Sequence, residues 1–97
     1  DEIGVSAVTL AEFFAGLRPP ERNGWQTLLK DVTHWDVTRE IAIQAGNFRY
    51  DFARRGRTIF IPDALIAATA VIARAALVTA NVRGFPMPEI EIIRLDA

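Results

Sequence analysis

The chain has 97 residues, 51% of them hydrophobic, and its formal net charge at pH 7 is −1. This length allows one domain, which we expect over residues 1–97, and the weak net charge excludes a strong overall attraction to nucleic acid. Cysteine is absent, which excludes disulfides and thiolate metal sites and fits a cytoplasmic location. No uncharged apolar run reaches the roughly 17 to 25 residues of a membrane span, so no membrane partner is expected.

The first half of the chain predicts two short strands and two helices. Ile3 to Val8 is apolar and predicts a buried strand. Thr9 with Glu12 three residues later fits a capping box, which predicts that a helix begins there and continues through AEFFAGL. A second helix is expected from Glu21 to about Lys30, after a pair of prolines. A short strand is expected at Trp35 to Val37, which the neighbours Val32 and His34 could extend.

The second half predicts two longer helices and two strands. Thr38 is the expected N-cap of a helix from Arg39 to Arg55, whose apolar residues recur at steps of three and four. These residues are Ile41, Ala45, Phe48 and Phe52. An alanine-rich helix follows from Asp63, then a strand at Leu77 to Thr79, a loop with two prolines, and a last strand at Glu91 to Arg94. Alternating helices and apolar strands predict an α/β fold with a mainly parallel sheet covered by helices on both faces.

Four oxygen-bearing side chains follow predicted strands or begin predicted helices. Glu12 and Asp63 have simple structural explanations, as part of a capping box and as an N-cap favoured by the helix dipole. Asn81 fits a turn after a strand, and Thr79 could hydrogen-bond a carboxylate. Taken together, the four residues predict a carboxylate and amide site at the rim of the sheet. Such ligands, without histidine or cysteine, suit Mg²⁺ or Mn²⁺ and the hydrolysis of phosphodiesters by activated water.

Two further groups of residues have both a structural and a functional interpretation. Arginines gather near the end of one predicted helix, where they are either a solvated face or contacts for RNA phosphates. They are Arg49, Arg54, Arg55 and Arg57. Large apolar residues surround the proline pair, and any that are exposed would mark a protein partner site. They are Phe13, Phe14, Leu17 and Trp25.

The segments SAVTLAEFFAGL, FIPDALIAATA and LVTANVRGFP, in this order and spacing, resemble PIN-domain ribonucleases, specifically VapC-type toxins of toxin–antitoxin pairs. The resemblance implies a three-layer α/β/α fold and a Mg²⁺- or Mn²⁺-dependent endoribonuclease. It implies that Glu12 and Asp63 are acids of the metal site and that Asn81 belongs to a T-x-[DN] motif with Thr79. It also implies inhibition by a cognate antitoxin protein and a homodimer.

The sequence departs from the family pattern at its start. Family members begin with a central strand that carries an aspartate, and this chain begins at what resembles the second strand. Asp1 does not replace that aspartate, because no apolar strand precedes it. We therefore expect an N-terminally truncated PIN-like domain, a metal site with two carboxylates, and unpaired edges on the two strands beside the gap.

Three hypotheses follow from these observations. The first is an RNA-cleaving toxin in which Glu12 and Asp63 hold the metal. The second is a catalytically incomplete PIN-like module that acts by binding an antitoxin or a second copy of the chain. In the third, the protein is an unrelated small α/β domain whose acids are only helix caps.

Overall fold

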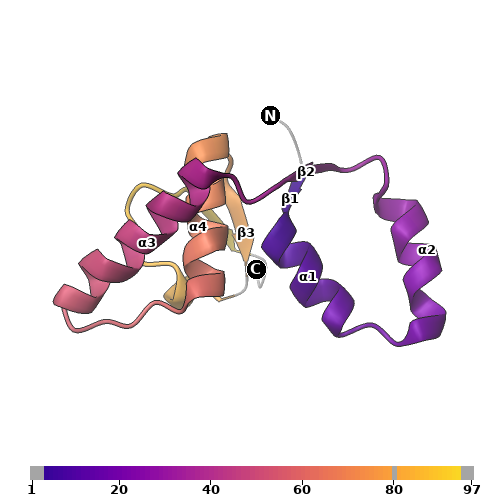
Figure 1. Ribbon diagram of the computed structural model, residues 1–97, viewed down its shortest axis with the longest axis horizontal. Helices are drawn as coiled ribbons and strands as arrows, with labels where there is room; N and C mark the ends of the chain where they lie inside the picture. The colour runs from indigo at the N-terminus through magenta and orange to yellow at the C-terminus, as the bar shows by residue number, and fades with distance from the viewer. Residues whose placement is uncertain (1–3, 80, 95–97) are drawn as a thin grey trace.

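A computed structural model describes residues 4–79 and 81–94, so Asp1 and the start of the strand expected from Ile3 lie outside the described residues. Helices and short strands alternate along the chain, and Figure 1 shows them in two groups. One group contains β1 (Gly4–Ser6), α1 (Ala7–Ala15), α2 (Pro19–Leu29) and β2 (Thr33–Trp35). The other contains α3 (Arg39–Arg54), α4 (Ile61–Ala73), β3 (Leu77–Thr79), the 3₁₀ turn η1 (Val82–Gly84) and β4 (Ile92–Arg94).

All the strand pairs in the described residues are parallel, as the alternation of elements predicted. β1 pairs with β2, with Val5 opposite His34, and β3 pairs with β4, with Val78 opposite Ile93. Among the described strands, no pairing joins β1 to β3, so the sheet consists of two separate halves. The α/β fold class, with short parallel sheets, is therefore confirmed.

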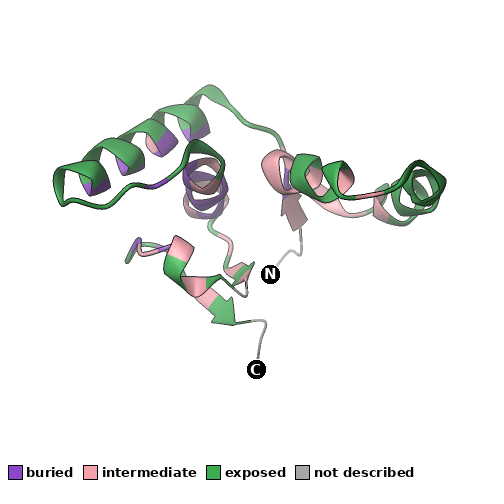
Figure 2. Cartoon of the chain, turned by 90° about the horizontal axis from the view of Figure 1, so that it is seen from below, coloured by how far each residue is buried: buried purple, intermediate pink, exposed green. Residues whose placement is uncertain are grey.

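The hydrophobic core is built mainly by α3 and α4. α3 buries the four residues predicted from its helical period, Ile41, Ala45, Phe48 and Phe52. They pack against an alanine-rich face of α4, where Ala64, Ala67 and Ala68 have no exposed surface. Figure 2 shows the buried residues along the facing sides of these two helices. Small side chains on α4 allow the close approach, since each alanine leaves room for a phenylalanine or isoleucine of α3.

The loop before β4 contributes to the core although it forms no regular element. Phe85, Met87 and Ile90 are buried there, and they join the cluster made by α3 and α4. The two prolines between them are more exposed, so apolar and proline residues alternate between the core and the surface. The prolines of this segment predicted a loop, and its apolar residues were not expected in the core.

The α1–α2 pair buries much less surface than the α3–α4 pair. Neither helix contains a buried residue, and α1 contacts the core through half-buried Val8. The radius of gyration is 14.1 Å, against about 12.5 Å for a compact chain of this length. The excess agrees with Figure 1, in which α2 stands at the far side of the molecule from α3. None of the described helices is long and apolar enough to cross a membrane.

Several predicted boundaries differ from the structure. α2 begins two residues earlier than predicted, because Pro19 and Pro20 form its first turn rather than preceding it. β2 is Thr33–Trp35, so the strand extends toward His34, as the sequence allowed, and ends before Asp36 and Val37, since register with β1 selects the residues that pair. β3 has the predicted bounds, Leu77–Thr79.

Candidate functional site

Glu12 lies on the exposed side of α1 and has no role in capping that helix. The N-cap is Ser6, whose Oγ accepts a hydrogen bond of 3.0 Å from the backbone N–H of Thr9 and donates one of 2.9 Å to Thr9 Oγ1. The predicted capping box of Thr9 and Glu12 is therefore wrong. Because β1 ends at Ser6 and α1 begins at the next residue, the cap falls three residues earlier than expected. Glu12 lies in the middle of α1, without the structural role first assigned to it.

Asp63 lies in the first turn of α4 and is half-buried. The N-cap of α4 is Phe60, and Pro62 follows within the first turn, so the prediction that Asp63 is the N-cap is wrong. Its position still favours a carboxylate, since the first turn carries the positive end of the helix dipole. Within the described residues, the Asp63 carboxylate has neither a hydrogen bond nor an ion pair. Its oxygens are thus available to a ligand.

Thr79 and Asn81 interact with each other at the end of β3. The Oγ1 atom of Thr79 accepts a hydrogen bond of 3.0 Å from the backbone N–H of Asn81. The Asn81 side chain is exposed and leans over Gly84, where an added Cβ atom would lie 2.6 Å from its amide nitrogen. Gly84 therefore leaves the space that this orientation needs. No direct hydrogen bond links Thr79 or Asn81 to Glu12 or Asp63 within the described part of the chain.

The helices that carry the two acids are neighbours, because α1 packs against α4. However, nowhere in residues 4–79 and 81–94 do three or more acidic or histidine side chains come close enough to hold a metal ion together. A metal ion held by carboxylates needs several oxygen ligands in a defined geometry. Among the described residues, Glu12 on α1 and Asp63 on α4 are the two candidate carboxylate ligands.

The four arginines proposed to contact RNA lie at the end of α3 and just beyond it, and each interacts with the protein. Arg49 donates a hydrogen bond of 2.9 Å to the carbonyl of Ile59, and Arg57 donates one to the carbonyl of Arg83. These two hydrogen bonds hold the segment between α3 and α4 against α3 and against the turn η1. Arg54 lies over the ring of Tyr50, and Arg55 lies 4.3 Å from the centre of the Phe52 ring. All four arginines are nevertheless exposed, so their remaining donors face solvent.

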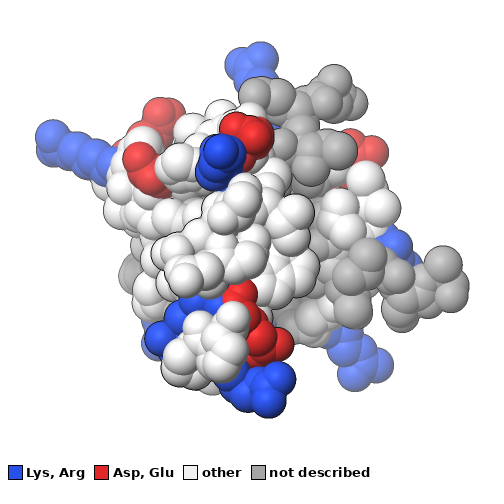
Figure 3. Space-filling model, turned by 90° about the vertical axis from the view of Figure 1, so that its right-hand side faces the viewer, with Lys and Arg blue, Asp and Glu red and all other residues white. Residues whose placement is uncertain are grey.

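The α1–α2 pair presents an apolar surface around a pocket of about 220 Å³. The pocket is lined only by Val5, Thr9, Leu10, Phe13, Trp25 and Leu29. Phe13 and Trp25 form an edge-to-face pair with ring centres 5.0 Å apart, and each is more than one-third exposed. Viewed from the α2 side, uncharged surface lies between groups of charged side chains (Figure 3). Exposed aromatic residues around an apolar pocket are typical of a protein partner site.

The sequence is similar to two curated ribonucleases of Mycobacterium tuberculosis. It is 37% identical to Ribonuclease VapC19 over 87 residues, which cover 90% of this chain and 70% of the relative. It is also 37% identical to Ribonuclease VapC10 over 87 residues, which cover 65% of that relative. The chain thus spans about two-thirds of the length of both proteins.

The fold is similar to the toxin–antitoxin complexes of two further bacteria. VapBC2 from Rickettsia felis, solved bound to a DNA fragment from its promoter, matches with a TM-score of 0.81 and 26% identity over 98% of this chain and 76% of that one. DNA-bound VapBC from Salmonella typhimurium matches with a TM-score of 0.78 and 30% identity over 92% of this chain and 72% of that one. The family model of the PIN domain matches residues 1–87. Since this match covers most of the chain, including Glu12 and Asp63, the chain belongs to the PIN-domain family.

Proposed function

We propose that this chain is the ribonuclease of a VapC-type toxin–antitoxin pair, which hydrolyses RNA phosphodiesters and depends on Mg²⁺ or Mn²⁺. The observation that carries the proposal is the 37% identity to VapC ribonucleases over 90% of the chain. An RNA substrate is consistent with the exposed arginines at the end of α3, which suit contacts with phosphates. Such a reaction belongs in the cytoplasm, where the RNA is, and we propose one catalytic domain over residues 1–97.

Glu12 and Asp63 are the acids to which we assign the reaction. Both are free of hydrogen bonds and ion pairs within the described residues, and neither caps its helix. A carboxylate without a structural partner is available to a cation or to a water molecule. Asn81 and Thr79 lie at the end of β3, and we assign them supporting roles at the same rim. One or two carboxylates commonly suffice for Mg²⁺, which completes its coordination with water molecules and substrate phosphates.

The proposed protein partner is an antitoxin that covers the apolar α1–α2 surface. Phe13 and Trp25 are aromatic, exposed and paired, and residues of this type contribute most to binding at interfaces. A homodimer is the second assembly that we propose. In either assembly, partner binding would bury apolar area that the isolated chain leaves in water.

The test is cleavage of a fluorogenic RNA by the purified chain, with Mg²⁺, with Mn²⁺ and with a chelator. Asp63→Ala should lower metal-dependent cleavage by about 100-fold or more, as loss of a catalytic carboxylate does. Its expected cost in stability is only about 0.3–1 kcal/mol, the usual contribution of an acid in the first helical turn. Asp51→Ala is the matched control, because Asp51 is an exposed acid on α3, away from this rim. Equal cleavage by the Asp63 and Asp51 variants would refute the assignment.

The second candidate function is a PIN-like module that binds a partner and does not cut RNA. The open apolar surface of α1 and α2 favours it. RNA that stays intact with either metal ion, together with tight binding of an antitoxin peptide, would select this function. Metal-dependent cleavage by the unmodified chain would exclude it.

A further inference from the structure

Gly84, the last residue of the turn η1, leaves room for the side chain of Asn81. A Cβ atom added at Gly84 would lie 2.6 Å from the amide nitrogen of Asn81 and 3.2 Å from its Cγ. The backbone of Gly84 does not need a glycine, because its φ is not positive. An alanine there would therefore leave the turn intact and push away the Asn81 amide, which is the far end of a flexible side chain.

Arg57 holds the same turn from a distant part of the chain. It lies in the connection between α3 and α4 and donates a hydrogen bond to the carbonyl of Arg83 in η1, 26 residues further on. Arg49 of α3 holds the same connection through a hydrogen bond of 2.9 Å to the carbonyl of Ile59. This connection leads directly into the first turn of α4, where Asp63 lies. Arg57 thus links the start of the helix that carries Asp63 to the turn that follows Asn81.

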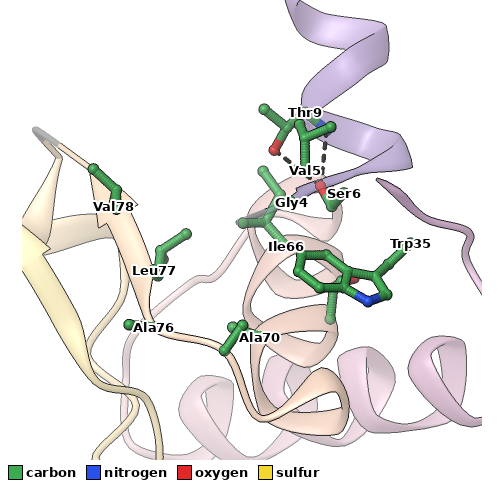
Figure 4. A pocket seen from close by; sticks show the side chains of 12 residues that line it. Gly4, Val5, Ser6, Thr9, Trp35, Ile66, Ala70, Ala76, Leu77 and Val78 are labelled. Carbon is green, nitrogen blue, oxygen red and sulfur yellow. Dashed lines mark hydrogen bonds between the residues drawn. The ribbon is translucent and has the colours of Figure 1, made fainter. Parts of the chain in front are cut away.

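The strand before Asn81 is fixed by packing, but Asn81 itself is not. Leu77 of β3 lines a pocket together with Ile66 and Ala70 of α4, and Figure 4 shows these residues around it. Leu77 also packs against the hydrophobic core, whereas Asn81 lies beyond the end of β3 and is exposed. The position of its amide relative to Asp63 therefore depends on the contacts made at the end of β3 and in η1.

We infer that Gly84 and Arg57 are positioning residues for the proposed metal site, which fix the Asn81 amide at the end of β3. This role rests on the proposed function, because it gives a purpose to the orientation of Asn81. Misplacement of a group by about 1 Å can lower a reaction rate about 100-fold. Neither residue acts by touching RNA, so Arg57 differs in role from the arginines assigned to phosphate contacts.

The first test compares Gly84→Ala with Gly46→Ala in the 97-residue chain. Gly84→Ala should lower kcat for RNA cleavage by about 10- to 100-fold and leave KM unchanged. Gly46→Ala places a methyl group on α3 where nothing lies within 4 Å, so kcat and KM should both stay unchanged. In an Asn81→Ala background, Gly84→Ala should have no further effect on kcat, because it acts only through Asn81. A full effect in that background would overturn the role of Gly84.

The second test separates positioning by Arg57 from contact with RNA. Arg57→Ala should lower kcat, and Arg57→Lys should restore most of it, since lysine keeps a donor for the carbonyl of Arg83. RNA affinity, measured with a chelator so that no cleavage occurs, should keep the same dependence on salt. A phosphate contact would instead weaken binding and reduce the salt slope by about 1, which would overturn the inference for Arg57. Arg39→Ala is the control at the opposite end of α3 and should change neither quantity.

A third readout needs neither RNA nor metal. In NMR spectra of the metal-free chain, the side-chain amide protons of Asn81 should show nuclear Overhauser effects to the α protons of Gly84. The Asn81 amide signals should shift in Gly84→Ala and Arg57→Ala and stay in place in Gly46→Ala. Unchanged Asn81 signals in the first two variants would overturn the inference. If the unmodified chain cleaves no RNA, the proposed function fails, and these signals still decide whether Gly84 and Arg57 position Asn81.

Discussion

Ser6 joins the end of β1 to the start of α1, and Ser6→Ala tests whether this residue holds the junction together. The serine side chain makes two hydrogen bonds to Thr9 and is 7% exposed. Loss of an N-cap costs about 0.5–2 kcal/mol. The substitution also removes the hydroxyl that donates to Thr9 Oγ1, a bond with a net contribution of about 0.5–1.5 kcal/mol. We expect a total destabilisation of about 1–3.5 kcal/mol.

Thr9→Ala provides the matched comparison. It removes the hydroxyl bond but leaves the backbone N–H of Thr9 on Ser6, so about 0.5–1.5 kcal/mol should be lost. Urea unfolding measures both losses of stability. An unchanged slope of the unfolding free energy against urea concentration would show that the surface exposed on unfolding is the same. Amide exchange at Thr9 should accelerate in Ser6→Ala and stay slow in Thr9→Ala. A larger loss in Thr9→Ala than in Ser6→Ala would mean that Thr9 is the cap after all, and the described junction would be wrong.

Three further substitutions test the core and one backbone position. Ile41→Ala should lower the free energy of unfolding by about 2–5 kcal/mol, because Ile41 is only 3% exposed. Ile43→Ala is the control on the same helix, where the side chain is 56% exposed, and it should change stability by no more than about 0.5 kcal/mol. Equal losses of stability in urea unfolding would contradict the assigned buried and exposed faces of α3. Arg74 ends α4 in the left-handed conformation, with φ of 55°. Arg74→Gly should therefore raise stability by about 0.5–1 kcal/mol, because it removes about 1–2 kcal/mol of backbone strain and adds the smaller entropy cost of a glycine. A lower Tm would show that the arginine side chain stabilises the fold by more than its backbone strain costs.

The periodic parts of the chain could be predicted because their signal is local. The positions of Ile41, Ala45, Phe48 and Phe52 follow the helical repeat, and all four are buried as expected. The uncharged run at Leu77–Thr79 is long enough for one short strand, and Asn81, a turn residue, follows it. In such segments, neighbouring residues alone decide which face is apolar, so no knowledge of distant contacts was needed.

The caps could not be predicted from local patterns. Thr9 with Glu12 and Asp63 with its proline both match helix-start patterns, yet the helices start earlier, at Ser6 and Phe60. The starting point depends on where the preceding strand or connection ends, and that is decided by pairing and packing with other elements. Both helix-start patterns are thus present in the sequence, but the N-cap of each helix lies three residues before the one that the pattern indicates.

The sequence by itself determined the α/β class, the family and the identity of the candidate acids, because order and spacing of residues carry this information. Only the tertiary structure decided that Glu12 and Asp63 have no capping role and that Gly84 leaves room for the Asn81 side chain. It also placed Phe85 and Met87 in the core, although their loop has no periodic pattern. The physical reason is that burial, pairing and free edges arise from contacts between segments far apart in the chain.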